Sequence, residues 1–131
     1  MELTLSILPG RYAICRLGAG EAVPDWAQPS PGAGRFVSIT RTGDELSIVC
    51  FESAVPDLVR SDRVWRVLAV EGPLDFSLTG VLAALTAPLA EARVAVFALS
   101  TFDTDYLLVK DERLAQAVEA LARAGCRVKE T

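Results

Sequence analysis

The fold is decided by residues 63–129, RVWRVLAVEGPLDFSLTGVLAALTAPLAEARVAVFALSTFDTDYLLVKDERLAQAVEALARAGCRVK. Apolar periodicity predicts a strand over 63–71, a helix from about Leu78, strands over 94–100 and 105–109, a second helix, and an edge strand over 126–128. The order is therefore strand, helix, strand, strand, helix, strand. This βαββαβ order predicts a ferredoxin-like α+β unit, with an antiparallel sheet and its helices on one face.

The two predicted helices carry their own signals. Ser77 or Thr79 can cap the first helix, whose apolar stripe comprises Val81, Leu82, Leu85 and Leu89. Asp111 can cap the second helix, whose inner face comprises Leu114, Val118, Leu121 and Ala122. Gly125 is placed to end it as a C′ residue.

The first half has the same plan in a reduced form. Strands are predicted over 2–7, 11–17, 36–41 and 46–51, with a hairpin connection over 42–45 and a short helix or turn over 53–60. Residues 18–34 contain three prolines and four glycines, so a long loop replaces the leading helix. The chain is therefore predicted to be two tandem units, a truncated one over 1–62 and a complete one over 63–131.

Composition narrows the function. The net charge is −4 and the basic residues are scattered, which argues against nucleic acid as a partner. No apolar run reaches the roughly 20 residues of a membrane span. The start of the chain has no basic, apolar leader, and three isolated cysteines lie in apolar segments, so reduced thiols in a cytoplasmic protein are expected.

The same composition argues against an enzyme. The chain has no histidine, no paired Cys motif and no glycine-rich phosphate loop, and no cofactor is expected. A general acid or base would have to be Asp, Glu, Lys, Tyr or Cys with a shifted pKa, and no convergent set is apparent.

Two segments resemble a known family. Residues 38–50, SITRTGDELSIVC, and residues 95–109, AVFALSTFDTDYLLV, resemble small bacterial tandem ACT-domain proteins and each half of the animal cytosolic arginine sensors. This resemblance covers nearly the whole chain. It implies ACT-like units, no catalysis, and regulatory binding of an amino acid or similar small polar ligand at an interface between units. Because this chain matches one half of the animal proteins, the equivalent site would require a homodimer in which the second units meet.

The residues themselves offer groups for such a ligand. A helix N-terminus over 76–81 could receive a carboxylate, and Gly80 would allow close approach to its backbone. Asp105 could accept from an ammonium, and the edge strand at Ala95 and Val96 could pair with a ligand or a second chain. The resemblance adds the segment near Phe102. The candidate ligand-binding residues are Phe76, Ser77, Leu78, Thr79, Gly80, Val81, Ala95, Val96, Thr101, Phe102 and Asp105.

Other interpretations remain open at this point. Asp103 and Asp105 could be solvated turn residues, or carboxylates for Mg²⁺. Gly80 could be only a helix-start residue, and Trp65 and Phe97 could pack in the core or on a dimer face. At the level of the whole chain, a ligand-free dimerisation module is the main alternative to a ligand sensor, and an enzyme is the third.

Overall fold

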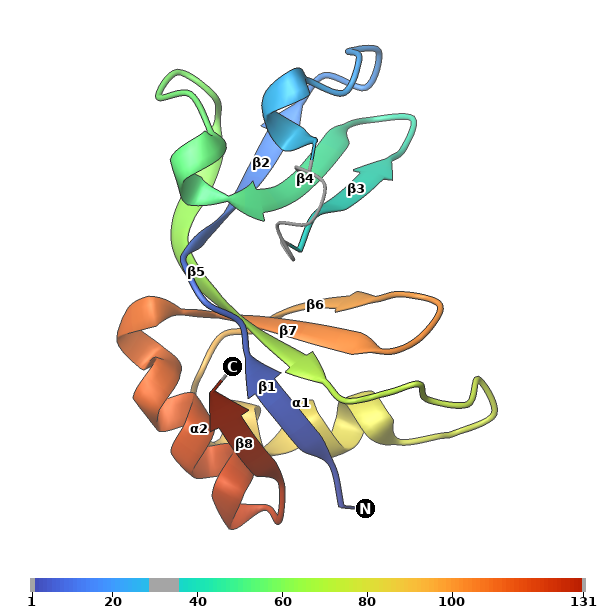
Figure 1. Ribbon diagram of the computed structural model, residues 1–131, viewed down its shortest axis with the longest axis vertical. Coiled ribbons are helices and arrows are strands. Elements are labelled where there is room, and N and C mark those ends of the chain that lie inside the picture. Colours follow the sequence, from blue (N-terminus) through green and yellow to red (C-terminus); the bar gives the residue numbers. More distant parts are fainter. Residues whose placement is uncertain (1, 29–35, 131) are drawn as a thin grey trace. The chain divides into compact units, whose positions relative to one another are not determined.

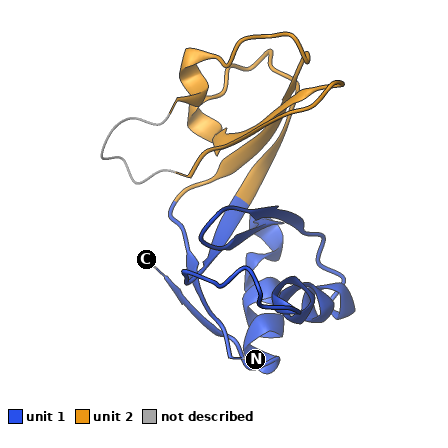
Figure 2. Cartoon of the chain, turned by 90° about the vertical axis from the view of Figure 1, so that its right-hand side faces the viewer, with its two compact units in different colours: residues 1–9, 66–131 blue, residues 10–65 orange. Residues whose placement is uncertain are grey.

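The computed structural model describes residues 2–28 and 36–130, which form two compact units. Unit 1 comprises residues 1–9 and 66–131, and unit 2 comprises residues 10–65 (Figure 2). The predicted division was a single boundary after residue 62. The structure instead places residues 1–9, which contain the first strand, in one unit with the C-terminal part of the chain.

Unit 1 is built on five strands in the order β8-β1-β5-β7-β6 (Figure 1). Their bounds are β1 Thr4–Ile7, β5 Ser61–Val70, β6 Phe97–Ser100, β7 Asp105–Lys110 and β8 Arg127–Glu130. Without β1 this is the ferredoxin-like order. β1 lies between β5 and β8, antiparallel to the first and parallel to the second. Residues 63–131 therefore need residues 4–7 to complete their sheet.

The two helices of unit 1 are α1, Val81–Glu91, and α2, Leu114–Arg123. Leu85 and Leu89 of α1 and Leu121 of α2 are fully buried in one hydrophobic cluster. The strands contribute Leu5, Leu68, Val70, Leu107 and Val109 to the same cluster. Both helices therefore pack on one face of the sheet, as the apolar stripes predicted.

The predicted helix caps are wrong. α1 begins after Gly80, whose φ of 79° lies in the left-handed region, and no side chain caps it. Asp111 instead opens a 3-10 turn, η3 Asp111–Arg113, and its carboxylate pairs with Arg66 at 3.2 Å. Leu82 of α1 and Ala122 of α2 are exposed rather than on the inner faces of their helices.

Unit 2 has the ferredoxin-like strand order, and its described residues have 3-10 turns where unit 1 has helices. Its strands β2 Tyr12–Leu17, β3 Ser38–Arg41, β4 Leu46–Phe51 and the first part of β5 run in the order β3-β4-β2-β5. The turns are η1 Asp25–Ala27 and η2 Glu52–Ala54. This confirms the prediction of a truncated copy. Part of the predicted 18–34 loop lies outside the described residues.

The three cysteines are buried and free, as expected for structural thiols. Cys15 and Cys50 belong to the apolar cluster of unit 2, whereas Cys126 lies in that of unit 1, where burial raises its pKa. Within the part of the chain that the structure describes, no helix is both long and apolar enough to cross a membrane.

Candidate functional site

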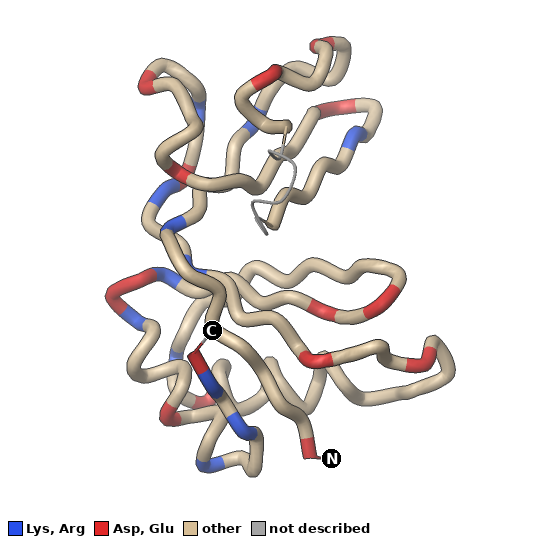
Figure 3. The backbone as a smooth tube through the Cα atoms, in the orientation of Figure 1, with Lys and Arg blue, Asp and Glu red and all other residues tan. Residues whose placement is uncertain are grey.

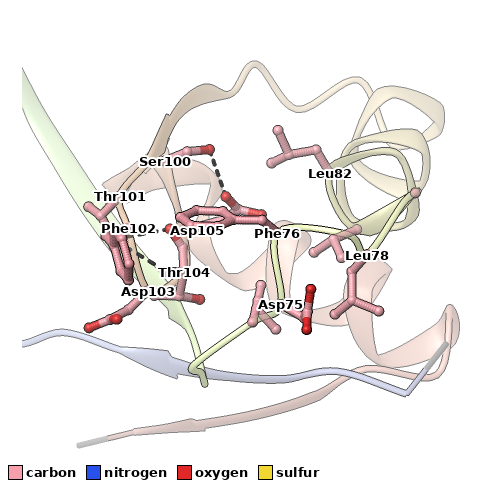
Figure 4. Close-up of a pocket in the computed structure, with 13 residues that line it drawn as sticks. Asp75, Phe76, Leu78, Leu82, Ser100, Thr101, Phe102, Asp103, Thr104 and Asp105 are labelled. Carbon is pink, nitrogen blue, oxygen red and sulfur yellow. Dashed lines mark hydrogen bonds between the residues drawn. The ribbon is translucent and has the colours of Figure 1, made fainter.

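A hollow of about 340 Å³ opens on unit 1 (Figure 4). Three segments enclose it: the loop 71–80 that follows β5, the start of α1, and the hairpin turn between β6 and β7. Its lining residues are Leu74, Asp75, Phe76, Leu78, Gly80, Val81, Leu82, Ser100, Thr101, Phe102, Asp103, Thr104 and Asp105.

Hydrogen bonds hold the loop against the hairpin. The Leu74 backbone N–H donates to the Asp103 carbonyl oxygen at 2.7 Å, and the Thr104 hydroxyl donates to the Val70 carbonyl oxygen at 2.6 Å. A Cβ at Gly72 would lie 2.9 Å from the Asp103 carbonyl oxygen, so only glycine allows this close approach. The loop and the turn are thus tied together beside the hollow.

The charged groups of the lining are all carboxylates: Asp75, Asp103 and Asp105, with no Lys or Arg among the lining residues. Figure 3 shows the acidic colour on the 71–80 loop and on the β6–β7 hairpin. Asp105 accepts a hydrogen bond from the Ser100 hydroxyl at 2.6 Å, across the strand pair that closes the hairpin. A carboxylate held in this way is ready to accept from a cationic group.

Asp75 is held by its own loop. Its Oδ1 accepts from the Ser77 hydroxyl at 2.7 Å and from the Ser77 backbone N–H at 2.8 Å. These two bonds hold the pKa of Asp75 below its usual value. Asp103 is exposed, and in Figure 4 its side chain points away from the middle of the hollow.

The start of α1 adds backbone donors. Gly80 is the N-cap residue of α1, and no side chain caps the helix. The first backbone N–H groups of α1 therefore have no acceptor within the helix or from a capping side chain. Together with the helix dipole, such groups can receive an anion. The hollow therefore has carboxylates on the loop and on the hairpin, and a helix N-terminus on its third side.

An exposed apolar rim surrounds these polar groups. The rings of Phe76 and Phe102 meet edge to face, with centroids 4.9 Å apart, yet these residues are 74% and 79% exposed. Leu78 and Leu82 of the same lining are 50% and 38% exposed. Exposed apolar side chains that gather at one place mark a surface that binds a ligand or a protein.

The structure brings together seven of the predicted site residues. Phe76, Leu78, Gly80, Val81, Thr101, Phe102 and Asp105 all line the hollow. Ser77 is not among its lining residues but orients Asp75, and Thr79 is also not among them.

Ala95 and Val96 lie elsewhere, and their strand assignment is wrong. β6 begins only at Phe97, Ala95 is exposed, and Val96 packs against the core of unit 1. Val94 and Val96 pack in the core, and the apolar run continues into the strand, so its pattern gave no boundary.

Several lining residues were missed, among them Asp75 and Ser100. The sequence Asp75-Phe76-Ser77 is a turn signal that could have identified the first, because an aspartate often bonds the residue two positions on. Ser100 could have been found as the cross-strand partner of Asp105. Within residues 2–28 and 36–130, no group of three or more His, Cys, Asp or Glu side chains could hold a metal ion.

Comparison with known families assigns the second half of the chain. The ACT domain model matches residues 60–123, which contain the loop, helix and hairpin of the hollow. Residues 60–123 of the chain are an ACT domain. A second model, which describes an N-terminal domain, matches residues 10–58, so the two matches follow the two halves of this ACT-domain protein.

Individual relatives match most or all of this chain. The bovine protein named cytosolic arginine sensor for mTORC1 subunit 1 is 31% identical over 100 residues, which are 68% of this chain and 30% of that protein. A crystal structure from Agrobacterium tumefaciens is similar over 100% of this chain and 95% of its own, with 41% identity and a TM-score of 0.91. This ACT-domain protein thus spans about 30% of the length of its bovine relative.

A third comparison concerns the fold alone. The ligand-free regulatory subunit of aspartate kinase from Thermus thermophilus is similar over 92% of this chain and 95% of its own. The TM-score is 0.58 at 12% identity. The same fold therefore occurs in a regulatory subunit whose sequence has little identity to this chain.

Proposed function

We propose that this ACT-domain protein is a regulatory protein that binds an amino acid in the hollow of unit 1 and catalyses no reaction. The proposal is supported by one observation: Asp105 and the uncapped N-terminus of α1 line the same hollow. An amino acid is a zwitterion, so its ammonium suits the carboxylate and its carboxylate suits the helix N-terminus. A volume of about 340 Å³ is at the lower end of the range for small-molecule sites.

The charge of the lining favours a cationic side chain on that amino acid. Three carboxylates and no basic residue line the hollow, so an acidic side chain would meet repulsion without a compensating partner. The exposed faces of Phe76 and Phe102 would also attract a cation. The name of the bovine relative, an arginine sensor, supports this direction.

A second copy of the chain is proposed to cover the hollow. The rim formed by Phe76, Leu78, Leu82 and Phe102 is too exposed for a finished ligand site, because ligand pockets bury most of their ligand's surface. The chain matches one stretch of a longer relative, so a homodimer would supply a second ACT unit. The relatives are cytosolic by name, which supports the cytoplasm as the place of action.

The same rim favours one alternative, a dimerisation module that binds no ligand. In that case the apolar side chains would bury each other across the dimer and leave no space for an amino acid. The two functions differ in whether amino acids stabilise the fold.

A thermal-shift screen of the wild type against the twenty amino acids tests the proposal. A ligand present at a hundred times its dissociation constant stabilises the folded state by roughly 2.7 kcal/mol. We expect a rise in Tm with one or more cationic amino acids and none with Asp or Glu. A flat screen, together with a dimer in sedimentation, would support the ligand-free module, and a monomer at high micromolar concentration would refute the dimer.

A further inference from the structure

The two units carry the same hairpin in corresponding places. The turn of unit 1, Thr101 to Thr104, and that of unit 2, Thr42 to Glu45, are each closed by a backbone bond between the first and fourth residues, at 2.8 and 2.9 Å. Each turn follows the strand at the end of its sheet order and precedes a buried strand. The hairpins can therefore be compared residue by residue.

The chemistry at the base of the hairpin is changed in unit 2. The pair that flanks the turn is Ser100 with Asp105 in unit 1, but Arg41 with Leu46 in unit 2. The carboxylate is thus replaced by a leucine that is fully buried, and the hydroxyl that orients it is replaced by a guanidinium. Arg41 thus stands in the place of Ser100, directly across the strand pair from the position that the carboxylate of Asp105 has in unit 1.

The guanidinium of Arg41 is also bonded across the unit. It donates to the carbonyl oxygen of Ala19, in the segment that follows β2 as the 71–80 loop follows β5. In unit 1, the hairpin and the 71–80 loop enclose the hollow. In unit 2, the side chain of Arg41 joins the corresponding hairpin and loop.

A second arginine completes the bridge. The Asp103 carbonyl oxygen of unit 1 accepts from the Leu74 backbone N–H at 2.7 Å, while the corresponding Asp44 carbonyl oxygen accepts from Arg16 Nη2 at 2.9 Å. Backbone contact in unit 1 is thus replaced by side-chain contact in unit 2, and two guanidinium groups lie at this hairpin.

We propose that Arg41 occupies, in unit 2, the cation position that the ligand takes in unit 1, so that each chain has one ligand site. The proposal rests on the proposed function for the meaning of the unit 1 site. Arg41 is a tethered substitute for a ligand cation, and unit 2 keeps the ACT hairpin with its site permanently filled. Removal of the guanidinium would reopen a position for a free guanidinium ion.

Chemical rescue tests this without knowledge of the ligand. Methylguanidinium is titrated into ¹⁵N-labelled wild type, Arg41→Ala and Arg123→Ala, and the backbone amide shifts of residues 18–21 and 42–45 are followed. Arg123→Ala is the matched control, because it removes an exposed arginine whose partner is Glu119 on α2. Arg41 is itself exposed on β3, so Arg41→Ala should keep the dispersed spectrum of the folded protein.

We expect saturable shifts at residues 18–21 and 42–45 in Arg41→Ala, with a half-saturating concentration roughly tenfold lower than in the wild type or in Arg123→Ala. Equal shifts in all three proteins, or no shifts in Arg41→Ala, would overturn the proposal. The outcome does not depend on an amino acid binding to unit 1, so failure of the proposed function is seen separately in the thermal-shift screen.

Discussion

Replacement of Asp105 by asparagine should weaken ligand binding while leaving the fold intact. In the wild type the Ser100 hydroxyl lies 2.6 Å from the Asp105 carboxylate. The asparagine amide keeps an oxygen that can accept from this hydroxyl, so the hairpin loses little stability. The charge-assisted bond to a ligand cation is lost, and such a bond contributes about 1.5–3 kcal/mol. The dissociation constant of the amino acid chosen by the screen should therefore rise roughly tenfold to a hundredfold.

The matched control is Asp103→Asn, which makes the same change of charge on the same hairpin. The Asp103 side chain points away from the middle of the hollow, and its carbonyl, not its carboxylate, holds the loop. Without direct contact the effect is small, because two unit charges about 10 Å apart in water interact by only ~0.4 kcal/mol, and affinity should fall at most about twofold. Isothermal titration calorimetry on the wild type and both variants decides this. Equal losses in the two variants, or no loss in Asp105→Asn, would refute a direct contact.

Three further predictions concern stability and chemistry. Leu85 is fully buried under the sheet of unit 1, so Leu85→Ala should lower the free energy of unfolding by about 2–5 kcal/mol in urea titrations. Because hydrogen bonds from Ser77 lower the pKa of Asp75, the stabilisation from this carboxylate exists above the ordinary pKa of an aspartate and is lost as the pH falls through the lowered one. Ser77→Ala should bring the Asp75 titration, followed by NMR, closer to that of an ordinary aspartate, and an unchanged titration would contradict the assigned bonds. The three cysteines are buried and free, so mass spectrometry of unreduced protein should find no disulfide, and a mass lower by two hydrogens would contradict this.

Much of the architecture could be predicted because it depends on periodicity. The period of α2 and the alternation in β1 each place apolar residues on one face, and both segments bury that face in the same core. The insertion of β1 between β5 and β8 could not be predicted in this way. Periodicity shows that residues 4–7 have a buried face but does not show which strand they pair with.

Residues that line the hollow could be predicted where a local sequence signal marks them. They could not be predicted where their position depends on a contact between distant segments. Asp105 and Gly80 could be named from a turn and a helix start in the sequence. The caps of α1 failed because Gly80 reaches a left-handed conformation after a loop that turns on Asp75 and Ser77, which the helical pattern does not encode. The bond between Leu74 and Asp103 joins residues far apart in the sequence, so only the folded loop reveals it.

The most direct test of amino-acid binding in the hollow is an NMR titration of ¹⁵N-labelled wild type with the amino acid that raises Tm most. Binding in the hollow predicts saturable shifts of the backbone amides of residues 74–82 and 100–105, the segments that enclose it. It also predicts that residues 18–21 and 42–45 of unit 2 stay unchanged, because Arg41 fills their site. Shifts confined to other segments, or no saturable shifts with any amino acid, would contradict binding of an amino acid in the hollow.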